Sequence, residues 1–492
     1  MVIVNVDGKE IEVEKGKILL EILQENGFDI PTLCYHKDLG SLASCRLCTV
    51  ELLRNGRTSY ITSCNYPITR DIQIKTDSPT LKNIKKTILE LLLARCPEVK
   101  YLQDLAKKFG VEKTPYPLEY EDCLLCGLCV RACNEIAGAH AINFSGRGLD
   151  KKITTPFGIV SDLCINCNEC VKVCPSGTVE LLVKQYSKTP DRLASGHRLC
   201  AGCAESIIIR QVLHSTDYPV VVSNATGCTE VATTIYPYTA WRVPWIHSAF
   251  ENAAATISGI ESYYNVAKRK GKMEDIIKFI AFGGDGGTYD IGIQALSGAA
   301  ERGHDFLYVC LNNEAYMNTG IQRSGATVLG ASTTTSPAGS VIPGKKQFSK
   351  DMTEIMVAHK IPYVAQASPG FYNDLISKAT KAFNIKGPKF INIISPCPRG
   401  WRFDPERSIE LARKAVETCV WPLYEVSNYK YRLTGLSRMI AEGKKEKVPI
   451  EEYLRMQGRF SHLFNDKFKG VISDIQHKID QDWEILKKKC GY

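Results

Sequence analysis

The sequence has no apolar run of roughly 18 residues or more, the length that a membrane helix needs, so we expect no membrane span. It also lacks the basic start and apolar centre of a signal peptide, because its first residues, MVIVNVDGKEIEVEKG, alternate apolar and polar side chains. No long block of lysine and arginine is present, and the short basic runs at 268–272 and 487–489 are typical of solvated faces. These absences favour a cytoplasmic protein that binds neither membranes nor nucleic acid.

Cysteine, by contrast, is abundant: the 492 residues include 20 cysteines, most of them in tight pairs and quartets. Disulfides are rare in the cytosol, so this spacing indicates metal binding. The formal net charge is +9, and an oxidised iron–sulfur cluster with four thiolates carries about −2, so several clusters would offset most of that excess. With 44% hydrophobic and 23% charged residues, the composition is that of a globular protein of about two to four domains.

The first cysteine group follows a predicted strand hairpin at 2–13 and a helix at about 17–27. It combines a C-x2-C pair with one outlying cysteine on each side, which is the arrangement of a plant-type [2Fe-2S] site with a longer first gap. A four-cysteine zinc site is the alternative, although such sites usually pair cysteines two by two at short spacing. The predicted [2Fe-2S] ligands are Cys34, Cys45, Cys48 and Cys64, with His36 left at the surface.

Two further stretches, CLLCGLCVRAC and CINCNECVKVCP, repeat the C-x2-C-x2-C-x3-C spacing of proteins with two [4Fe-4S] clusters. In such folds the fourth cysteine of each stretch binds the cluster of the other stretch. The predicted ligand sets are Cys123, Cys126, Cys129 and Cys174 for one cluster, and Cys164, Cys167, Cys170 and Cys133 for the other.

A third group is looser, and its spacing alone is only suggestive of a metal site. It consists of Cys200, Cys203, Cys228 and Cys397. Short buried strands predicted at 219–222 and 389–394 end just before Cys228 and Cys397, which favours a common position at the edge of a sheet. The other four cysteines have no partner nearby in the sequence and are interpreted as structural: Cys96, Cys310, Cys419 and Cys490.

Four glycines surround one aspartate in the stretch GGDGGTYDIG, at 283–292. The stretch lies between a strand predicted at 276–282 and a helix predicted at 289–300. Glycines between a strand end and a helix start let the backbone approach an anion, so Gly284, Gly286 and Gly287 are candidate phosphate-binding residues. A glycine-rich turn alone is weak support, and the dinucleotide fingerprint G-x-G-x-x-G is absent.

A second predicted strand, at 306–311, ends in the pair Asn312–Asn313. If the two strands are parallel neighbours, this pair and Asp285 lie at the same sheet edge, where open α/β sheets bind their ligands. Carboxylate and amide oxygens are suitable ligands for a Mg²⁺ ion that bridges a diphosphate. The combination of GDG with a downstream NN is the pattern of thiamine diphosphate (TPP) binding.

Residues from about 190 to 492 resemble the TPP-binding β subunit of 2-oxoacid:ferredoxin oxidoreductases, the pyruvate synthase type most closely. The matching stretches are GHRLCAGC, ATGCTEV, AFGGDGGTYDIGIQALSGAAERGHDFLYVCLNNEAYMNTGIQRS, SPCPRGWRFDP and WPLYE. The resemblance implies that the third cysteine group holds a [4Fe-4S] cluster proximal to TPP, and that Mg²⁺ binds Asp285, Asn313 and the Ala315 carbonyl. It further implies cofactor contacts at Thr226, Gly227 and Cys228, a contact of Glu205 with the aminopyrimidine, and a substrate-facing role for Asn318.

Residues 1 to about 185 resemble instead the N-terminal region of the large electron-input subunit of complex I and of NAD-linked hydrogenases. IPTLCYH, ASCRLCTVEL, CLLCGLCVRAC and CINCNECVKVCPSG carry this match. That family often has an additional cluster held by one histidine and three cysteines. The corresponding region here, LLLARCPEVKYLQDLAKKFG, contains Cys96 alone and no histidine, so we expect that cluster to be absent.

These observations predict an α/β protein of four parts. They are a [2Fe-2S] β-grasp ferredoxin-like domain (1–75), a helical connector (76–120), a ferredoxin-like domain with two [4Fe-4S] clusters (121–185), and a doubly wound parallel-sheet TPP-binding domain with the proximal cluster (186–492). The boundaries follow the positions of the cysteine groups and the glycine-rich stretch along the chain.

The predicted function is that of the β subunit of a 2-oxoacid oxidoreductase, with pyruvate as the favoured substrate and coenzyme A as the acyl acceptor. Electrons would pass through three [4Fe-4S] clusters and one [2Fe-2S] cluster to ferredoxin or to an NAD-binding flavoprotein, and activity would require α and γ partner subunits. One alternative is an electron-transfer scaffold with a vestigial TPP domain, although the GDG and NN positions are intact. Another is a non-oxidative TPP decarboxylase, which would have no use for sixteen cluster-spaced cysteines.

The four predicted clusters give an iron count that can be measured. Chemical analysis of the anaerobically purified chain should find about fourteen iron atoms per polypeptide, because one [2Fe-2S] and three [4Fe-4S] clusters are expected. A count near eighteen would contradict the predicted absence of the histidine-ligated cluster.

Overall fold

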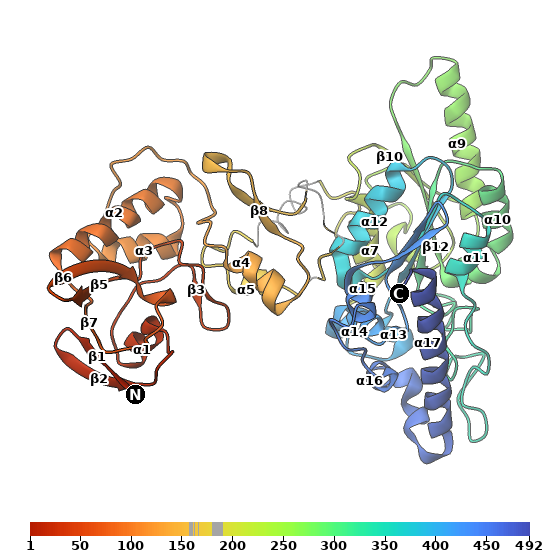
Figure 1. The fold of residues 1–492 in the computed structure, drawn as a ribbon. Coiled ribbons are helices and arrows are strands. Elements are labelled where there is room, and N and C mark those ends of the chain that lie inside the picture. Colours follow the sequence, from red (N-terminus) through yellow and green to blue (C-terminus); the bar gives the residue numbers. More distant parts are fainter. Residues whose placement is uncertain (157–160, 162, 166, 180–189) are drawn as a thin grey trace. The chain divides into compact units, whose positions relative to one another are not determined.

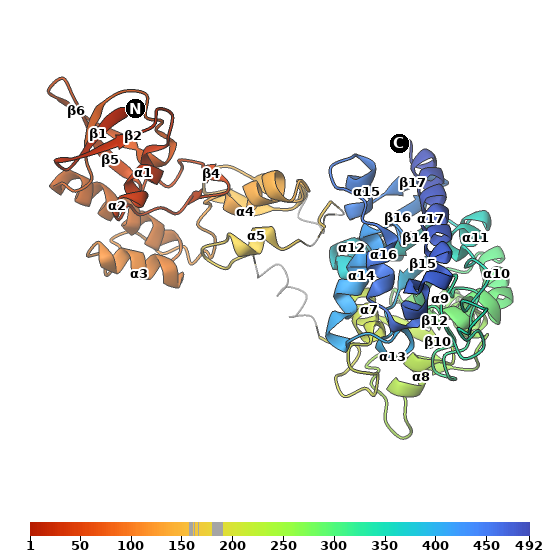
Figure 2. The same ribbon diagram turned by 90° about the horizontal axis from the view of Figure 1, so that it is seen from below.

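The structure is a computed structural model that describes all residues except 157–160, 162, 166 and 180–189 (Figures 1 and 2). It separates into two compact units. The first consists of Met1–Ile159 and Cys167–Lys188, and the second of Val160–Asn166 and Thr189–Tyr492. Among the described residues, no helix combines the length and the apolar character needed to cross a membrane.

The first unit begins with a five-stranded sheet in the order β2-β1-β7-β5-β6. Its strands are β1 (Val2–Val6), β2 (Lys9–Val13), β5 (Thr49–Arg54), β6 (Arg57–Thr62) and β7 (Ile72–Lys75). Apolar residues alternate along β1 and β2, so one face of this hairpin packs on helix α1 (Leu19–Glu25), whose Leu19, Leu20 and Leu23 are fully buried. The predicted hairpin and helix are therefore present.

Short elements and two longer helices make up the rest of the first unit. They are β3 (Tyr35–His36), β4 (Gly40–Ser41), α2 (Pro79–Arg95), α3 (Lys100–Lys108), α4 (Leu128–Arg131), β8 (Asn143–Ser145), β9 (Lys152–Thr154) and α5 (Glu169–Lys172). Ser78 directly precedes helix α2. Its side chain accepts a hydrogen bond from the Leu81 amide and caps the helix. Cys96 lies at the end of this helix, fully buried in an apolar cluster with Leu89 and Leu102, as expected for a structural cysteine.

The second unit is built on an eight-stranded sheet in the order β11-β10-β12-β13-β15-β14-β16-β17. Its strands are β10 (Val220–Asn224), β11 (Trp245–His247), β12 (Lys278–Gly284), β13 (Leu307–Asn312), β14 (Tyr363–Ala367), β15 (Lys389–Ile394), β16 (Tyr424–Ser427) and β17 (Lys430–Leu433). The first six in the sheet pair in parallel, and β16 and β17 add an antiparallel edge. The parallel part has the doubly wound character predicted from the sequence.

Helices cover both faces of this sheet, which explains why the central strands are almost continuously apolar (Figure 1). The helices are α7 (Ala204–Leu213), α8 (Cys228–Thr233), α9 (Ala253–Arg269), α10 (Ile293–Glu301), α11 (Met352–Ala358), α12 (Tyr372–Asn384), α13 (Pro398–Trp401), α14 (Ser408–Glu417), α15 (Gly435–Ala441), α16 (Ile450–Arg455) and α17 (Lys469–Lys489). Side chains such as Ile280 and Val309 pack against α7 and α12 in one core. On the other face, α9 contacts β10 and β12, and α11 contacts β14 and β15.

The predicted helix at 289–300 was placed too early. The chain instead forms a single π-helical turn at Gly286–Asp290, and the α-helix α10 begins at Ile293. Glycine is a poor helix former, and Gly286, Gly287 and Gly292 all lie in this stretch, so the sequence cannot sustain a regular helix until after Gly292.

Candidate functional site

The glycine-rich stretch lies where β12 ends, beside the end of β13. The two strands are parallel neighbours, with Gly284 paired with Leu311, so Asp285 and Asn313 meet one residue past the sheet edge. The Asn313 amide nitrogen donates to Asp285 Oδ1 at 3.1 Å, and the Ser324 hydroxyl donates to Asp285 Oδ2 at 2.5 Å. The carboxylate is fully buried. The predicted meeting of Asp285 with the asparagine pair is confirmed for Asn313, while the Asn312 side chain donates instead to the Tyr289 hydroxyl.

At two glycines of this stretch, a side chain would collide with or press on neighbouring atoms. A Cβ atom on Gly286 would lie 2.5 Å from the Tyr316 ring, and one on Gly287 would lie 3.1 Å from the Phe250 carbonyl oxygen. A side chain at Gly286 would force the Tyr316 ring to shift, and one at Gly287 would fit only tightly. We call this glycine-rich turn the cradle, since a backbone without side chains is expected where a phosphate approaches.

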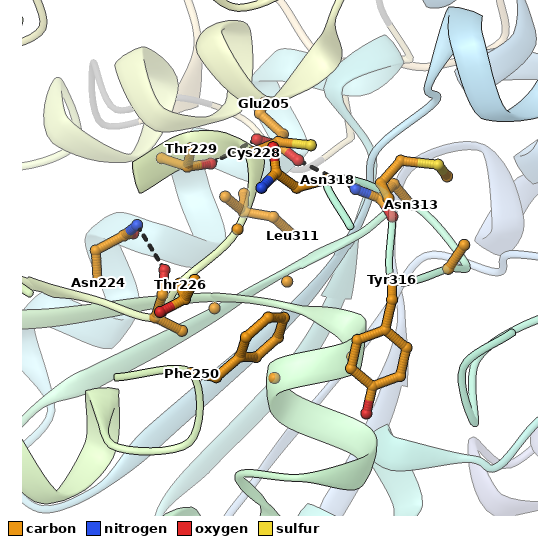
Figure 3. A pocket seen from close by; sticks show the side chains of 18 residues that line it. Glu205, Asn224, Thr226, Cys228, Thr229, Phe250, Leu311, Asn313, Tyr316 and Asn318 are labelled. Atoms are coloured by element: carbon orange, nitrogen blue, oxygen red, sulfur yellow. Dashed lines mark hydrogen bonds between the residues drawn. The ribbon is translucent and has the colours of Figure 1, made fainter. Parts of the chain in front are cut away.

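The cradle opens onto a cavity of about 30 Å³ (Figure 3). Most of its polar lining comes from the predicted cofactor residues, and Asn318 lies at the same cavity. The lining includes Glu205, Thr226, Gly227, Cys228, Gly284, Gly286, Gly287, Asn313, Ala315 and Asn318.

Asn313 carries an oxygen that the protein does not satisfy. Its Nδ2 donates to Glu205 Oε1 at 3.1 Å, while its Oδ1 is buried and has no hydrogen-bond partner. A buried acceptor without a partner is costly, and a metal ion beside Asp285 would remove that cost. The residues present thus fit a Mg²⁺ ion bound by Asp285 and Asn313.

The ionisation of Asp285 supports the same interpretation. Burial raises the pKa of Asp285 to about 8, the nearby Glu314 adds to the increase, and the hydrogen bonds from Ser324 and Asn313 oppose it. A carboxyl group that is neutral near pH 7 in the absence of metal becomes a ligand only when a cation compensates its charge.

Glu205 is held deep in the wall between two cavities. Thr229 donates a hydrogen bond to its Oε2 and Asn313 to its Oε1, and the side chain is almost completely buried. Burial raises the pKa of Glu205, and both hydrogen bonds oppose this increase. The contact with Thr229 was not predicted, although ATGCTEV places this threonine directly after Cys228.

The third cysteine group surrounds the second of these cavities, with a volume of about 220 Å³. Its sulfur-bearing lining residues are Cys200, Cys203, Cys228 and Cys397. Glu205, Cys228, Asn313 and Asn318 line both cavities and form a shared wall. Burial raises the pKa of Cys397 to about 11, and Glu205 contributes, so this thiol needs a strong cationic centre to ionise.

The [2Fe-2S] candidates lie in two close pairs in the first unit. The Cys34 and Cys45 sulfurs are 3.4 Å apart, and the Cys48 and Cys64 sulfurs are 3.1 Å apart. The Ser41 hydroxyl, which sequence reasoning missed, donates to the Cys64 sulfur at 2.7 Å. The hydrogen bond with Cys45 lowers the pKa of Cys34 to about 5, against the effect of burial.

One predicted [4Fe-4S] set lines a single cavity of about 240 Å³ in the first unit: Cys123, Cys126, Cys129 and Cys174. Cys174 comes from the second cysteine stretch and was predicted to bind the cluster of the first, and its place in this cavity agrees with that prediction. For the other set, Cys164 lies in the second unit and Cys133, Cys167 and Cys170 lie in the first, so these ligands stay a prediction.

Within the described ranges, no three His, Cys, Asp or Glu side chains converge tightly on one point that could hold a single metal ion. The sulfurs of the two quartets described above instead line spaces of more than 200 Å³. A cavity of this size has room for a cluster of several atoms.

The cysteines interpreted as structural lie mostly in the core. Cys310 and Cys96 are fully buried, Cys419 is almost so, and Cys490 is half-buried. His36 is partly exposed, and its nearest acidic partner is Asp38 at 3.7 Å, so it lies at the surface as expected.

Three stretches of the chain match known domain families. Residues 1–79 match the 2Fe-2S iron-sulfur cluster binding domain, and residues 122–178 match the 4Fe-4S dicluster domain. Residues 225–393 match the thiamine pyrophosphate enzyme, C-terminal TPP binding domain. The families follow the order of sites predicted from the cysteine spacing and the glycine-rich stretch.

Several known proteins are similar to somewhat more than half of the chain. Pyruvate synthase subunit PorB of Methanocaldococcus jannaschii is 52% identical over 308 residues, which are 62% of this chain and 99% of that protein. PorB of Thermotoga maritima is 47% identical over 314 residues, 63% of this chain and 95% of that one. Ketoisovalerate oxidoreductase subunit VorB of Pyrococcus furiosus is 43% identical over 294 residues, 60% of this chain and 92% of that one.

Two solved structures show weaker likenesses, from which we draw no argument. A chain of an NAD⁺-reducing [NiFe]-hydrogenase in the H2-reduced state is 30% identical, with a TM-score of 0.29, covering 31% of this chain and 74% of that one. A chain of 2-oxoglutarate:ferredoxin oxidoreductase from Magnetococcus marinus is 20% identical, with a TM-score of 0.36, covering 46% and 81%.

The raised pKa of Asp285 predicts how metal binding depends on pH. Below about pH 8 the carboxyl group is protonated and must lose its proton to bind Mg²⁺, so the affinity for Mg²⁺ with TPP should rise by up to about tenfold per pH unit from about pH 6 to 8 and then level off. Calorimetry on the intact complex in buffers of different ionisation enthalpy measures the affinity and the released proton. Asp285→Asn should abolish the slope, and Asp466→Asn, at an exposed carboxylate, should preserve it; an affinity independent of pH would contradict the assignment.

Proposed function

Because this chain belongs to the family of pyruvate synthase PorB subunits, we propose that it is the TPP-binding β subunit of a 2-oxoacid oxidoreductase that oxidises pyruvate with coenzyme A to acyl-CoA and CO2. The observation that carries the proposal is the wall shared between the Asp285–Asn313 cavity and the cavity of four cysteines. A cofactor that releases electrons and a cluster that accepts them would lie on its two sides.

Thiamine diphosphate, when bound, supplies the carbon nucleophile and the electron sink for decarboxylating a 2-oxoacid. The chain's part is to hold the diphosphate through Mg²⁺ at Asp285 and Asn313, with the Ala315 carbonyl as a further ligand. Gly286 and Gly287 allow the phosphates to approach the backbone. Glu205 and Asn318, which line both cavities, would contact the ring portion of the cofactor and the substrate.

Oxidation of one pyruvate releases two electrons, and iron–sulfur clusters accept them singly. Cys200, Cys203, Cys228 and Cys397 would hold the first acceptor, directly across the shared wall. The two [4Fe-4S] clusters of the 122–178 domain and the [2Fe-2S] cluster of the 1–79 domain would then carry the electrons onward. A TPP enzyme without redox function would need none of these sites.

Partner subunits complete the enzyme in this proposal. Family resemblance implies that the glutamate that activates the aminopyrimidine, and most substrate contacts, lie on an α subunit, with a γ subunit alongside. The sequence contains one GDG…NN pattern and no convincing coenzyme A site. We therefore expect the isolated chain to be inactive.

The terminal acceptor is proposed to be NAD, through a flavoprotein subunit. The 1–185 region resembles the electron-input subunits of NAD-linked complexes, and a simple ferredoxin-dependent enzyme would not require that module on this chain. A scaffold with a vestigial TPP domain is not favoured, because Asp285 and Asn313 retain an arrangement that fits a metal.

The route through the proximal cluster can be tested at one ligand. Cys228→Ser should remove the electron paramagnetic resonance (EPR) signal of the proximal cluster and lower acceptor reduction by at least roughly tenfold, because the first acceptor is lost. Cys419→Ser, at a buried cysteine outside the four predicted ligand sets, is the matched control. It should change neither the EPR signal nor the rate of acceptor reduction. Full acceptor reduction without the proximal signal would rule out this route.

The acceptor is decided by assaying the purified complex with pyruvate, coenzyme A and NAD⁺. Formation of NADH together with CO2 and acetyl-CoA is the expected result, and flavin should be present in the complex. If ferredoxin is reduced normally while no NADH appears, the acceptor is ferredoxin. Replacing pyruvate by a branched-chain 2-oxoacid in the same assay tests the substrate.

A further inference from the structure

Between the two proposed metal ligands of the asparagine loop lies an acidic residue that binds neither metal nor cofactor in the proposal. Glu314 follows Asn313 and precedes Ala315, and its backbone has φ 64°, in the left-handed region that favours glycine. Its side chain is 5% exposed. A charged residue in a strained and buried position persists only when its surroundings stabilise it there.

The partner of Glu314 comes from far along the chain. Arg459, in the short 3-10 helix Gly458–Phe464, forms an ion pair with Glu314 Oε2, and its side chain is 3% exposed. The guanidinium lies 4.1 Å from the Trp401 ring and 4.8 Å from the Phe460 ring, and its Nε donates to Gln457 Oε1 at 2.9 Å. The position of the guanidinium is thus fixed by a pairing charge, two aromatic rings and an amide oxygen.

The same arrangement controls the direction of two carbonyl groups. The indole nitrogen of Trp401 donates to the Asn313 carbonyl oxygen at 2.7 Å, and the Thr327 hydroxyl donates to the Glu314 carbonyl oxygen at 2.6 Å. Both carbonyls are therefore engaged by the protein, while Ala315, the next residue, lines the cofactor cavity. These contacts fix the loop backbone beside the cavity that Asn313 and Ala315 line.

We propose that the Arg459–Glu314 ion pair is a positioning device for the metal-binding loop, and that Arg459 sets the affinity for Mg²⁺ and TPP without touching either. The inference rests on the proposed function, and it assigns a role to a residue outside the matched TPP domain at 225–393. Arg459 has two effects: it anchors the backbone at Glu314, and it neutralises a buried negative charge close to Asp285.

The ion pair also matters for charge. Arg459 pairs directly with the buried Glu314 carboxylate, and Lys345 acts on the same carboxylate electrostatically. Lys345 itself donates to backbone carbonyl oxygens of Ser324 and Thr327. Without Arg459, the buried Glu314 carboxylate would lose its ion-pair partner, so its side chain would no longer anchor the loop between Asn313 and Ala315.

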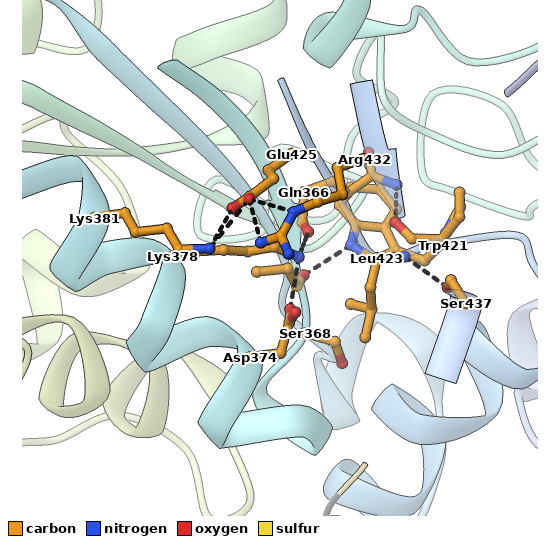
Figure 4. A network of polar contacts seen from close by, with 12 residues as sticks. Gln366, Ser368, Asp374, Lys378, Lys381, Trp421, Leu423, Glu425, Arg432 and Ser437 are labelled. Carbon is orange, nitrogen blue, oxygen red and sulfur yellow. Dashed lines mark hydrogen bonds and ion pairs between the residues drawn. The ribbon is translucent and has the colours of Figure 1, made fainter. Parts of the chain in front are cut away.

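A matched control is provided by a second buried ion pair in the same unit (Figure 4). Lys378 and Asp374 are 2.6 Å apart, with side chains 1% and 0% exposed, and Lys378 also donates to the Gln366 carbonyl oxygen. Neither residue lines the cofactor cavity or the four-cysteine cavity. Lys378→Met therefore leaves an equally buried carboxylate unpaired at a place that should not affect cofactor binding.

The test compares Arg459→Met with Lys378→Met in the intact complex after removal of TPP and metal. Calorimetry should find the dissociation constant for Mg²⁺ with TPP raised by about tenfold or more in Arg459→Met and changed less than about twofold in Lys378→Met. The double variant Glu314→Gln/Arg459→Met should recover part of the affinity, since no unpaired charge remains. If Arg459→Met does not fold, Arg459→Lys, which keeps the charge but not the stacking, should bind with intermediate affinity.

The inference is overturned if Arg459→Met, or Arg459→Lys in its place, binds as the wild type does, if Lys378→Met weakens binding equally, or if the double variant recovers nothing. Failure of the wild-type complex to bind Mg²⁺ with TPP would instead overturn the proposed function.

Discussion

The site depends on one buried carboxylate placed where two parallel strands end. The pairing of β12 with β13 brings Asp285 to the Asn313 amide, and the Asn313 side chain in turn reaches Glu205. Burying an uncompensated charge is costly, so the protein keeps this carboxylate poised for a cation and leaves Asn313 Oδ1 without a partner beside it. In the proposed function, the affinity for Mg²⁺ would depend on this arrangement, and Asn313 and Glu205 place the shared wall beside it.

In the proposed function, the shared wall brings decarboxylation and electron transfer together in one domain. Glu205 and Asn313 line both cavities, so a change in either residue would alter the surroundings of both proposed sites. Cys228 starts α8 directly after the Thr226–Gly227 turn that lines the cofactor cavity. The proposed cofactor contacts at Thr226 and Gly227 and the proposed cluster ligand Cys228 therefore belong to the same short turn.

The strands and the cysteine ligand sets could be predicted from the spacing of residues close together in the sequence. Contacts between residues far apart in the sequence could not. Strand 389–394 and the meeting of Asp285 with Asn313 were predictable, because buried parallel strands are apolar and end at one sheet edge. The grouping of Cys174 with Cys123 followed from the doubled cysteine register. The contacts of Ser324 with Asp285 and of Arg459 with Glu314 join residues 39 and 145 positions apart, and no pattern in the sequence indicates them.

The presence of the TPP domain and the iron–sulfur domains on one polypeptide bears on the rate of electron transfer between them. A covalent connection between the TPP domain and the iron–sulfur domains replaces a bimolecular encounter with an intramolecular one, at an effective concentration of about millimolar for a short linker. A separate ferredoxin would have to bind, accept one electron and leave, twice for each pyruvate. In the proposed function, holding the proximal, paired and [2Fe-2S] sites on one polypeptide would let both electrons leave the active site before any partner dissociates, which suits the proposed acceptor NAD, since NAD takes two electrons together.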